Sequence, residues 1–119
     1  MNTDFHVGNG RLKVELQAIS MGDDLVIRIY NEKAHIGAVA IGEYDFSHSR
    51  ASVSVITRLG HKDDALAQKA AYTISKELKK TVCVIAGVHL DDILPQEIIK
   101  LQNNSLKLID LYLKDNALK

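Results

Sequence analysis

The chain has 119 residues, the usual length of one domain, so we take residues 1–119 as a single unit with one hydrophobic core. Its 15 basic and 15 acidic side chains cancel without forming a basic cluster, which argues against nucleic-acid binding, and no apolar stretch approaches the roughly 18 residues of a membrane span. Residues 1–4 show no export signal, and one cysteine, Cys83, excludes an internal disulfide. We therefore expect a cytoplasmic protein in which Cys83 is a buried structural thiol.

Four segments in the first half of the chain are predicted to be β-strands. Apolar and polar residues alternate over 11–18, which is the pattern of a strand with one face in water. After a turn signal at 21–23, a second strand is expected over 25–30. Residues 36–41 are apolar on both faces, which favours a central strand, and residues 51–57 alternate again. Because the connections are short, we predict an antiparallel meander of these four strands.

The second half of the chain predicts a helix, a strand and a helix. Apolar residues recur every four positions from Leu66 to Leu78, and an apolar run at 82–86 reads as a fifth strand. A last helix begins near Pro95 and carries an apolar stripe wide enough to suggest a second partner. The predicted order is ββββαβα. The fold class is α/β of the α+β type, with one mixed five-stranded sheet and helices.

Three histidines are predicted to meet at one edge of this sheet. Strands joined by a crossover helix are normally parallel, so the fourth and fifth strands should end at the same edge. Each is followed by glycine and then by His-x-Asp-Asp, at 60–64 and 87–92. The third strand begins at that edge with His35. We therefore expect His35, His61 and His89 to converge, and His48 to lie at the opposite edge.

The edge where these histidines meet has the chemistry of a ligand site. Two helix N-termini point at it, and their N–H groups and dipoles favour an anion such as phosphate, to which Lys62 adds a positive charge. Imidazole and carboxylate groups are also usual ligands of a divalent metal. In a third interpretation, Asp63 or Asp64 and Asp91 or Asp92 only cap helices, and the histidines hydrogen-bond their own loops. The residues alone leave these alternatives open.

The segments His-Ile-Gly-Ala-Val at 35–39, Gly-His-Lys-Asp-Asp at 60–64 and Gly-Val-His-Leu-Asp at 87–91 together resemble a known family. This is the prenylated-flavin chaperone family, the small D subunit that accompanies UbiD-type decarboxylases such as gallate decarboxylase. The resemblance covers nearly the whole chain in motif order. It implies a fold like that of the proteasome assembly chaperones, a dimer, and binding of prenylated FMN or FMN for delivery to the decarboxylase.

The resemblance places the cofactor-binding residues in the three segments. The glycine, the lysine and the helix N-termini would hold the phosphate of the flavin nucleotide, and the histidines would contact its phosphate, a metal or the flavin ring. These candidate residues are His35, Gly37, Gly60, His61, Lys62, Asp63, Gly87, His89 and Asp91. A divalent metal remains an alternative ligand. The sequence has no evident activated nucleophile or oriented triad, so we expect binding without turnover.

Two other function classes remain open from the sequence. In the first, the histidines and aspartates bind a metal that activates water, with His61 or His89 as acid or base, which would make the protein a hydrolytic enzyme. In the second, the protein is an assembly chaperone that binds a protein partner through the apolar stripe of its last helix. We also expect a homodimer, with this helix or a sheet edge as the interface.

Overall fold

The computed structural model describes residues 4–59 and 63–116. Every predicted strand and helix is present, and the structure adds a short strand at the N-terminal end and a short 3-10 helix. The elements are β1 (Asp4–Val7), η1 (Gly10–Leu12), β2 (Val14–Met21), β3 (Asp24–Tyr30), β4 (Ala38–Asp45), β5 (Arg50–Thr57), α1 (Asp64–Leu78), β6 (Val82–Gly87) and α2 (Pro95–Asn116). β1 escaped prediction because it has only four residues and ends against Gly8, so its alternation is too short to be distinctive.

The described strands form one mixed sheet in the order β1-β2-β3-β6-β4-β5. β3 and β6 are parallel, and all other neighbours are antiparallel. The predicted five-stranded sheet with a four-stranded meander is therefore wrong in two respects. β1 adds an edge strand, and β6 lies between β3 and β4. The physical reason is that β6 is apolar at nearly every position, and a strand of this kind loses most contact with water at the centre of a sheet.

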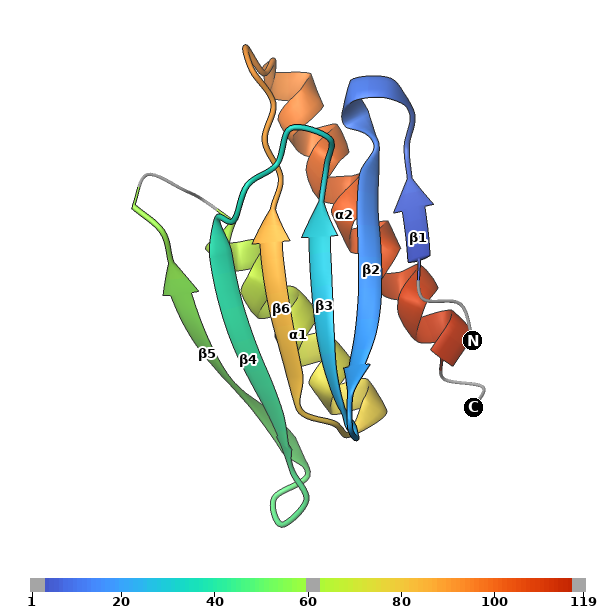
Figure 1. Ribbon diagram of the computed structural model, residues 1–119, viewed down its shortest axis with the longest axis vertical. Helices are drawn as coiled ribbons and strands as arrows, with labels where there is room; N and C mark the ends of the chain where they lie inside the picture. Colours follow the sequence, from blue (N-terminus) through green and yellow to red (C-terminus); the bar gives the residue numbers. More distant parts are fainter. Residues whose placement is uncertain (1–3, 60–62, 117–119) are drawn as a thin grey trace.

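Both helices cover the same face of the sheet (Figure 1). α1 packs against β4, β5 and β6, whereas α2 packs against β1 and β2. The side of α1 that faces the sheet carries Ala67, Ala70 and Ala71, which are fully buried and let the helix approach closely. At Gly42 of β4, a side chain would collide with the main-chain carbonyl of Ala71. The core lies between the helices and the inner strand residues, with the largest fully buried side chains at Leu16, Ile27, Ile29, Ile74 and Leu108.

The connection between β3 and β4 crosses the end of β6 (Figure 1). The N–H of Gly37 donates to the carbonyl oxygen of Ala86 at 2.9 Å, and the carbonyl oxygen of Gly37 accepts from the N–H of Arg58 at 2.9 Å. Gly87 leaves the space that the main-chain carbonyl of His35 occupies. This crossing brings the end of β3, the start of β4 and the end of β6 to one place.

The predicted meeting of the strand ends therefore holds, although the pairing behind it differs. β5 and β6 are not neighbours, but each is antiparallel to β4, so they run in the same direction and end at the same edge. The turn that contains His48 joins β4 to β5 at the opposite edge, as expected. Cys83 is half-buried rather than buried, because it lies on the face of the sheet away from the helices. Its partial burial raises the pKa of the Cys83 thiol.

Candidate functional site

His35 and His89 meet at the edge of the sheet where β6 ends. His35 lies on the connection between β3 and β4, and His89 lies two residues after β6. Their ring centroids are 5.5 Å apart, and the ring planes are inclined by 31°. The structure thus brings these two histidines together, as the topology argument predicted. Gly60, His61 and Lys62 lie outside the described residues, so the position of His61 stays a prediction.

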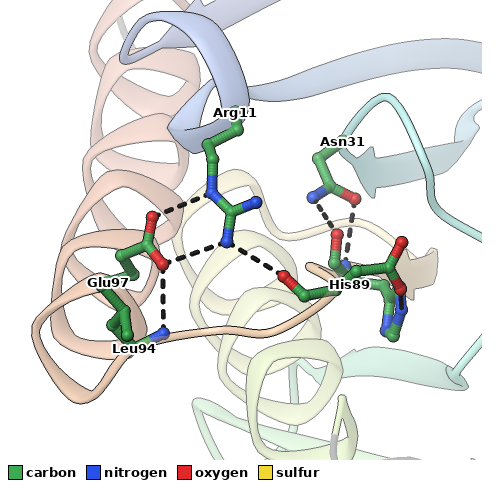
Figure 2. Close-up of polar contacts among 6 residues, drawn as sticks. Arg11, Asn31, His89, Leu94 and Glu97 are labelled. Carbon is green, nitrogen blue, oxygen red and sulfur yellow. Dashed lines mark hydrogen bonds and ion pairs between the residues drawn. The ribbon is translucent and has the colours of Figure 1, made fainter.

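The side chain of Asn31 holds the main chain of His89 (Figure 2). Asn31 directly follows β3 and is only 4% exposed. Its Nδ2 donates to the carbonyl oxygen of His89 at 2.6 Å, and its Oδ1 accepts from the N–H of His89 at 3.0 Å. One amide therefore satisfies both backbone groups of His89. Because β3 and β6 are parallel neighbours, this contact joins the segments that follow the two strands, one of which carries His89.

Asp91 orients the ring of His89. The Nε2 atom of His89 lies 3.0 Å from Oδ1 of Asp91, which assigns the ring proton to Nε2 because a carboxylate can only accept. The hydrogen bond from His89 is the main reason why the pKa of Asp91 lies below its usual value, and the charges of His89 and Lys33 act in the same direction. The Nζ atom of Lys33 is 3.9 Å from Asp91. Asp91 is therefore an ionised hydrogen-bond partner of His89 at neutral pH.

A second clamp fixes the start of α2 (Figure 2). Arg11 of η1 donates through Nε and Nη2 to the two carboxylate oxygens of Glu97, at 2.9 and 3.0 Å, and through Nη2 to the carbonyl oxygen of Asp91 at 3.0 Å. Glu97 also accepts from the N–H of Leu94 at 3.0 Å, as in one half of a capping box. Arg11 lowers the pKa of Glu97 by this bidentate contact. The loop from β6 to α2 is thus held at both ends.

Asp63 joins the start of α1 to the end of β6. It lies at the N-cap of α1, where it was expected to cap the helix, but its side chain makes no capping hydrogen bond. Its Oδ1 instead accepts from the N–H of Val88 at 3.2 Å, and its carboxylate occupies the space that a side chain at Gly37 would need. Gly37 and Gly87 therefore allow neighbouring segments to approach closely, because a side chain at either position would collide with them. Neither lines the cavity described next.

A cavity of about 540 Å³ opens beside the histidine pair, bounded by the first turns of α1, the loop after β6 and the first half of α2. Most of its wall is apolar, and the charged or titratable groups His35, Asp63, Lys69 and His89 lie on the α1 and β6 side. The remaining lining residues are Ala65, Leu66, Val88, Ile93, Ile98, Leu101, Gln102, Ser105 and Leu106. The cavity can bury the apolar part of a small-molecule ligand. It can also offer hydrogen bonds and the positive charge of Lys69 to a polar group of the same ligand.

Asp91 lies outside this cavity and lines an adjoining hollow of about 350 Å³ with Arg11, Lys13 and Lys33. Among the described residues, no group of three or more His, Cys, Asp or Glu side chains is placed to hold a metal ion. In residues 4–59 and 63–116, no helix is long and apolar enough to cross a membrane.

Three residues that shape the site were missed by the sequence reasoning: Lys69, Asn31 and Arg11. Lys69 lies three residues after Leu66, so the helical period placed the two on one face, but nothing in the sequence showed that this face borders a cavity. A polar residue directly after an apolar strand could have marked Asn31. Arg11 carries no local signal, because its partner Glu97 is 86 residues away.

The fold resembles that of a proteasome assembly chaperone. A solved structure described as the crystal structure of a novel chaperone complex for yeast 20S proteasome assembly matches with a TM-score of 0.60 and 15% sequence identity, over 99% of this chain and 100% of that chain. At this level of identity, the likeness shows the fold alone. The comparison with curated proteins gave no match.

Residues 8–117 match the model of a protein family, which is described as the prenylated flavin chaperone LpdD-like domain. The match includes the three motif segments and every described element except β1. The chain therefore belongs to the LpdD-like prenylated flavin chaperone family.

Proposed function

We propose that the protein binds prenylated FMN in the cavity between α1 and α2 and delivers it to a UbiD-type decarboxylase. The observation that carries this proposal is the cavity itself, which has a volume of about 540 Å³ and a histidine pair at its rim, in a member of the prenylated flavin chaperone family. Cavities of roughly 300–1,000 Å³ are the usual size for small-molecule ligands.

The lining fits the two parts of such a ligand. Leu66, Ile93 and Leu101 offer apolar surface to the flavin rings and their prenyl addition. Lys69 offers a permanent positive charge to the phosphate. The carboxylate of Asp63 repels an anion, so we expect the phosphate nearer to Lys69 than to the first residue of α1.

A delivery role requires that the ligand can leave again. Ile98 and Leu106 line the cavity and are nevertheless both 43% exposed, so the wall formed by α2 borders solvent. The ligand would leave along this side. The His89 ring, with its proton on the Nε2 atom that faces Asp91, presents a lone pair at Nδ1 while neutral and a second N–H donor when charged. Both forms can hold a flavin nucleotide by hydrogen bonds without reacting with it.

Binding is tested by titrating the purified protein with FMN and with prenylated FMN and following flavin fluorescence. We expect saturable binding of prenylated FMN, and we expect Lys69→Ala to weaken it about tenfold, which is about 1.4 kcal/mol. Lys76→Ala is the matched control, because Lys76 lies on the same helix outside the cavity. Absence of binding, or equal affinity of the parent and Lys69→Ala, would contradict the proposed site.

Delivery is tested by mixing the loaded protein with a cofactor-free UbiD-type decarboxylase and measuring the onset of decarboxylation. We expect faster onset than with the same concentration of free prenylated FMN. Equal rates from the loaded protein and from the free cofactor would restrict the role to binding.

A further inference from the structure

The loop from β6 to α2, residues 88–94, lines one side of the cavity and is attached to the rest of the domain at two places (Figure 2). Near β6, the side chain of Asn31 holds both main-chain groups of His89. Near α2, the guanidinium of Arg11 holds the carboxylate of Glu97. Because the two attachments use different residues, the α2 end of the loop can be released while the β6 end stays in place.

The middle of this loop has an unusual backbone angle that Arg11 helps to maintain. Asp92 has a φ angle of 50°, a left-handed conformation that residues with a side chain seldom adopt. The planar peptide group before Asp92 contains the carbonyl oxygen of Asp91, to which Nη2 of Arg11 donates at 3.0 Å. This hydrogen bond fixes the peptide group and so helps to hold the φ angle. Without Arg11, the loop is free to relax toward an ordinary backbone conformation.

Arg11 also fixes the position of two apolar residues in the cavity wall. It lies outside the cavity itself, in the adjoining hollow, where it holds Glu97. Glu97 in turn accepts a hydrogen bond from the N–H of Leu94. Ile93 and Ile98 directly adjoin these two residues in the sequence, and both line the cavity. A shift of the first turn of α2 would therefore move apolar surface away from the cavity.

We infer that Arg11 is a positioning residue for retention of the flavin. It keeps Ile93 and Ile98 against the ligand, and the ligand leaves faster when the contact between Arg11 and Glu97 is broken. The inference rests on the proposed function, because the flavin must occupy this cavity. Loops that cover a ligand often set how fast it leaves, and Arg11 is what holds the α2 end of this loop.

The side-chain chemistry of arginine separates this role from a simple attraction between Arg11 and an anionic ligand. Its planar guanidinium contacts both carboxylate oxygens of Glu97 and the carbonyl oxygen of Asp91, whereas the compact ammonium group of lysine cannot make all three contacts. Arg11→Lys therefore keeps the charge and loses the clamp. If Arg11 acted only by its charge, this variant would release flavin as the parent does. The side chain of Arg11 is 49% exposed, so the variant should remain folded.

Retention is tested by the dissociation rate of prenylated FMN, measured by stopped-flow dilution of the loaded protein and followed by flavin fluorescence. We expect about tenfold faster dissociation for Arg11→Lys and for Glu97→Gln, with an association rate that does not fall. The double variant should add little to the larger single effect, because both substitutions break one contact. Arg50→Lys, at an exposed position at the opposite edge of the sheet, is the matched control and should leave the rate within about twofold.

A second measurement needs no ligand, because NMR relaxation of the protein alone gives the order parameters of the N–H groups in the loop. In Arg11→Lys we expect those of Asp92 and Ile93 to fall from about 0.85 toward about 0.6. The order parameter of His89, whose N–H is held by Asn31, should stay unchanged. Equal dissociation rates in the parent and Arg11→Lys, or unchanged order parameters, would overturn the inference and leave the proposed function standing. A parent that binds no flavin would instead contradict the proposed function, and the retention role with it.

Discussion

At the scale of single residues, the buried amide of Asn31 fixes the main chain that carries His89. It makes two hydrogen bonds to the main chain of His89, whose ring centroid lies 5.5 Å from that of His35. A leucine has a similar volume but offers no polar group. Replacement would leave the N–H and the carbonyl of His89 without their present partner, in a part of the structure where water reaches poorly.

We therefore predict that Asn31→Leu lowers the free energy of unfolding by about 2–4 kcal/mol, since an unsatisfied buried polar group costs about 1–3 kcal/mol. Urea unfolding followed by circular dichroism measures the change. Asn103→Leu, at an exposed position of α2, is the control and should change stability by less than about 0.5 kcal/mol. Equal unfolding midpoints for the two variants would show that Asn31 does not hold the site together.

The contact between His89 and Asp91 predicts a specific pH dependence. Hydrogen bonding by His89 lowers the pKa of Asp91 in the folded state, so the stabilisation is present above the ordinary aspartate pKa of about 4 and is lost as the pH falls through the lowered value. We predict that His89→Ala raises the pKa of Asp91 toward its ordinary value. Carbon-13 NMR titration of the side-chain carboxyl measures this shift.

The chain contains its own control for this titration. At the opposite edge, His48 lowers the pKa of Asp45 through a contact of 2.7 Å. In the His89→Ala variant the pKa of Asp45 should stay low. In His48→Ala the pKa of Asp45 should rise, and the pKa of Asp91 should stay low. An Asp91 carboxyl that titrates identically in the parent and in His89→Ala would show that the two side chains do not interact in solution.

At the scale of elements, the connection from β3 to β4 depends on two glycines with different neighbours. A side chain at Gly87 would meet the main-chain carbonyl of His35, whereas one at Gly37 would meet the side-chain carboxylate of Asp63. A main-chain carbonyl cannot move without moving the whole connection. A carboxylate at the end of a side chain can be removed by mutation.

We predict that Gly87→Ala lowers the free energy of unfolding by about 1–3 kcal/mol or more, because overpacking forces the backbone to shift. Gly37→Ala should also destabilise the protein, but the double variant Gly37→Ala with Asp63→Ala should recover part of the loss, whereas His35→Ala should not rescue Gly87→Ala. Thermal unfolding of these single and double variants measures the differences. Rescue of Gly87→Ala by His35→Ala would place the clash on the imidazole rather than on the backbone.

The elements themselves could be predicted from the sequence because each has a strong local signal. The alternation in β2 and β5 and the four-residue repeat in α1 depend only on which residues face the core. The position of β6 in the sheet could not be predicted, because strand order depends on which partners bury the most apolar surface. The apolar content of β6 was visible, and it favours a central position, but the short loops before it suggested the meander more strongly.

The same distinction applies to the site. The edge at which the motifs meet follows from strand direction, and the direction was inferred correctly even though the pairing was not. The cavity could not be foreseen, because it lies between two helices whose relative position is set by tertiary packing. Lys69, Ile98 and Leu106 border it for that reason and lie outside the sequence motifs.

At the scale of the whole molecule, one sheet separates a face that the helices cover from a face that they leave uncovered. The helices and the cavity lie on one face, and side chains such as Val26, Cys83 and Ile41 lie on the other. Among the described residues, no strand residue lines the cavity proposed to bind the ligand. A substitution on the face away from the helices, such as Ile41→Glu, should therefore leave the affinity for prenylated FMN within about twofold.

The proposed site for prenylated FMN lies between α1 and α2, and the most direct test is to fill that space. Gln102 lines the cavity, and its neighbour Asn103 is exposed outside it, so Gln102→Trp and Asn103→Trp place the same large side chain inside and outside the cavity. The measurement is the dissociation constant for prenylated FMN of both variants and of the parent, by fluorescence titration. The proposed site predicts affinity at least about tenfold weaker for Gln102→Trp, which is about 1.4 kcal/mol, and unchanged affinity for Asn103→Trp. Parental affinity in Gln102→Trp would contradict it.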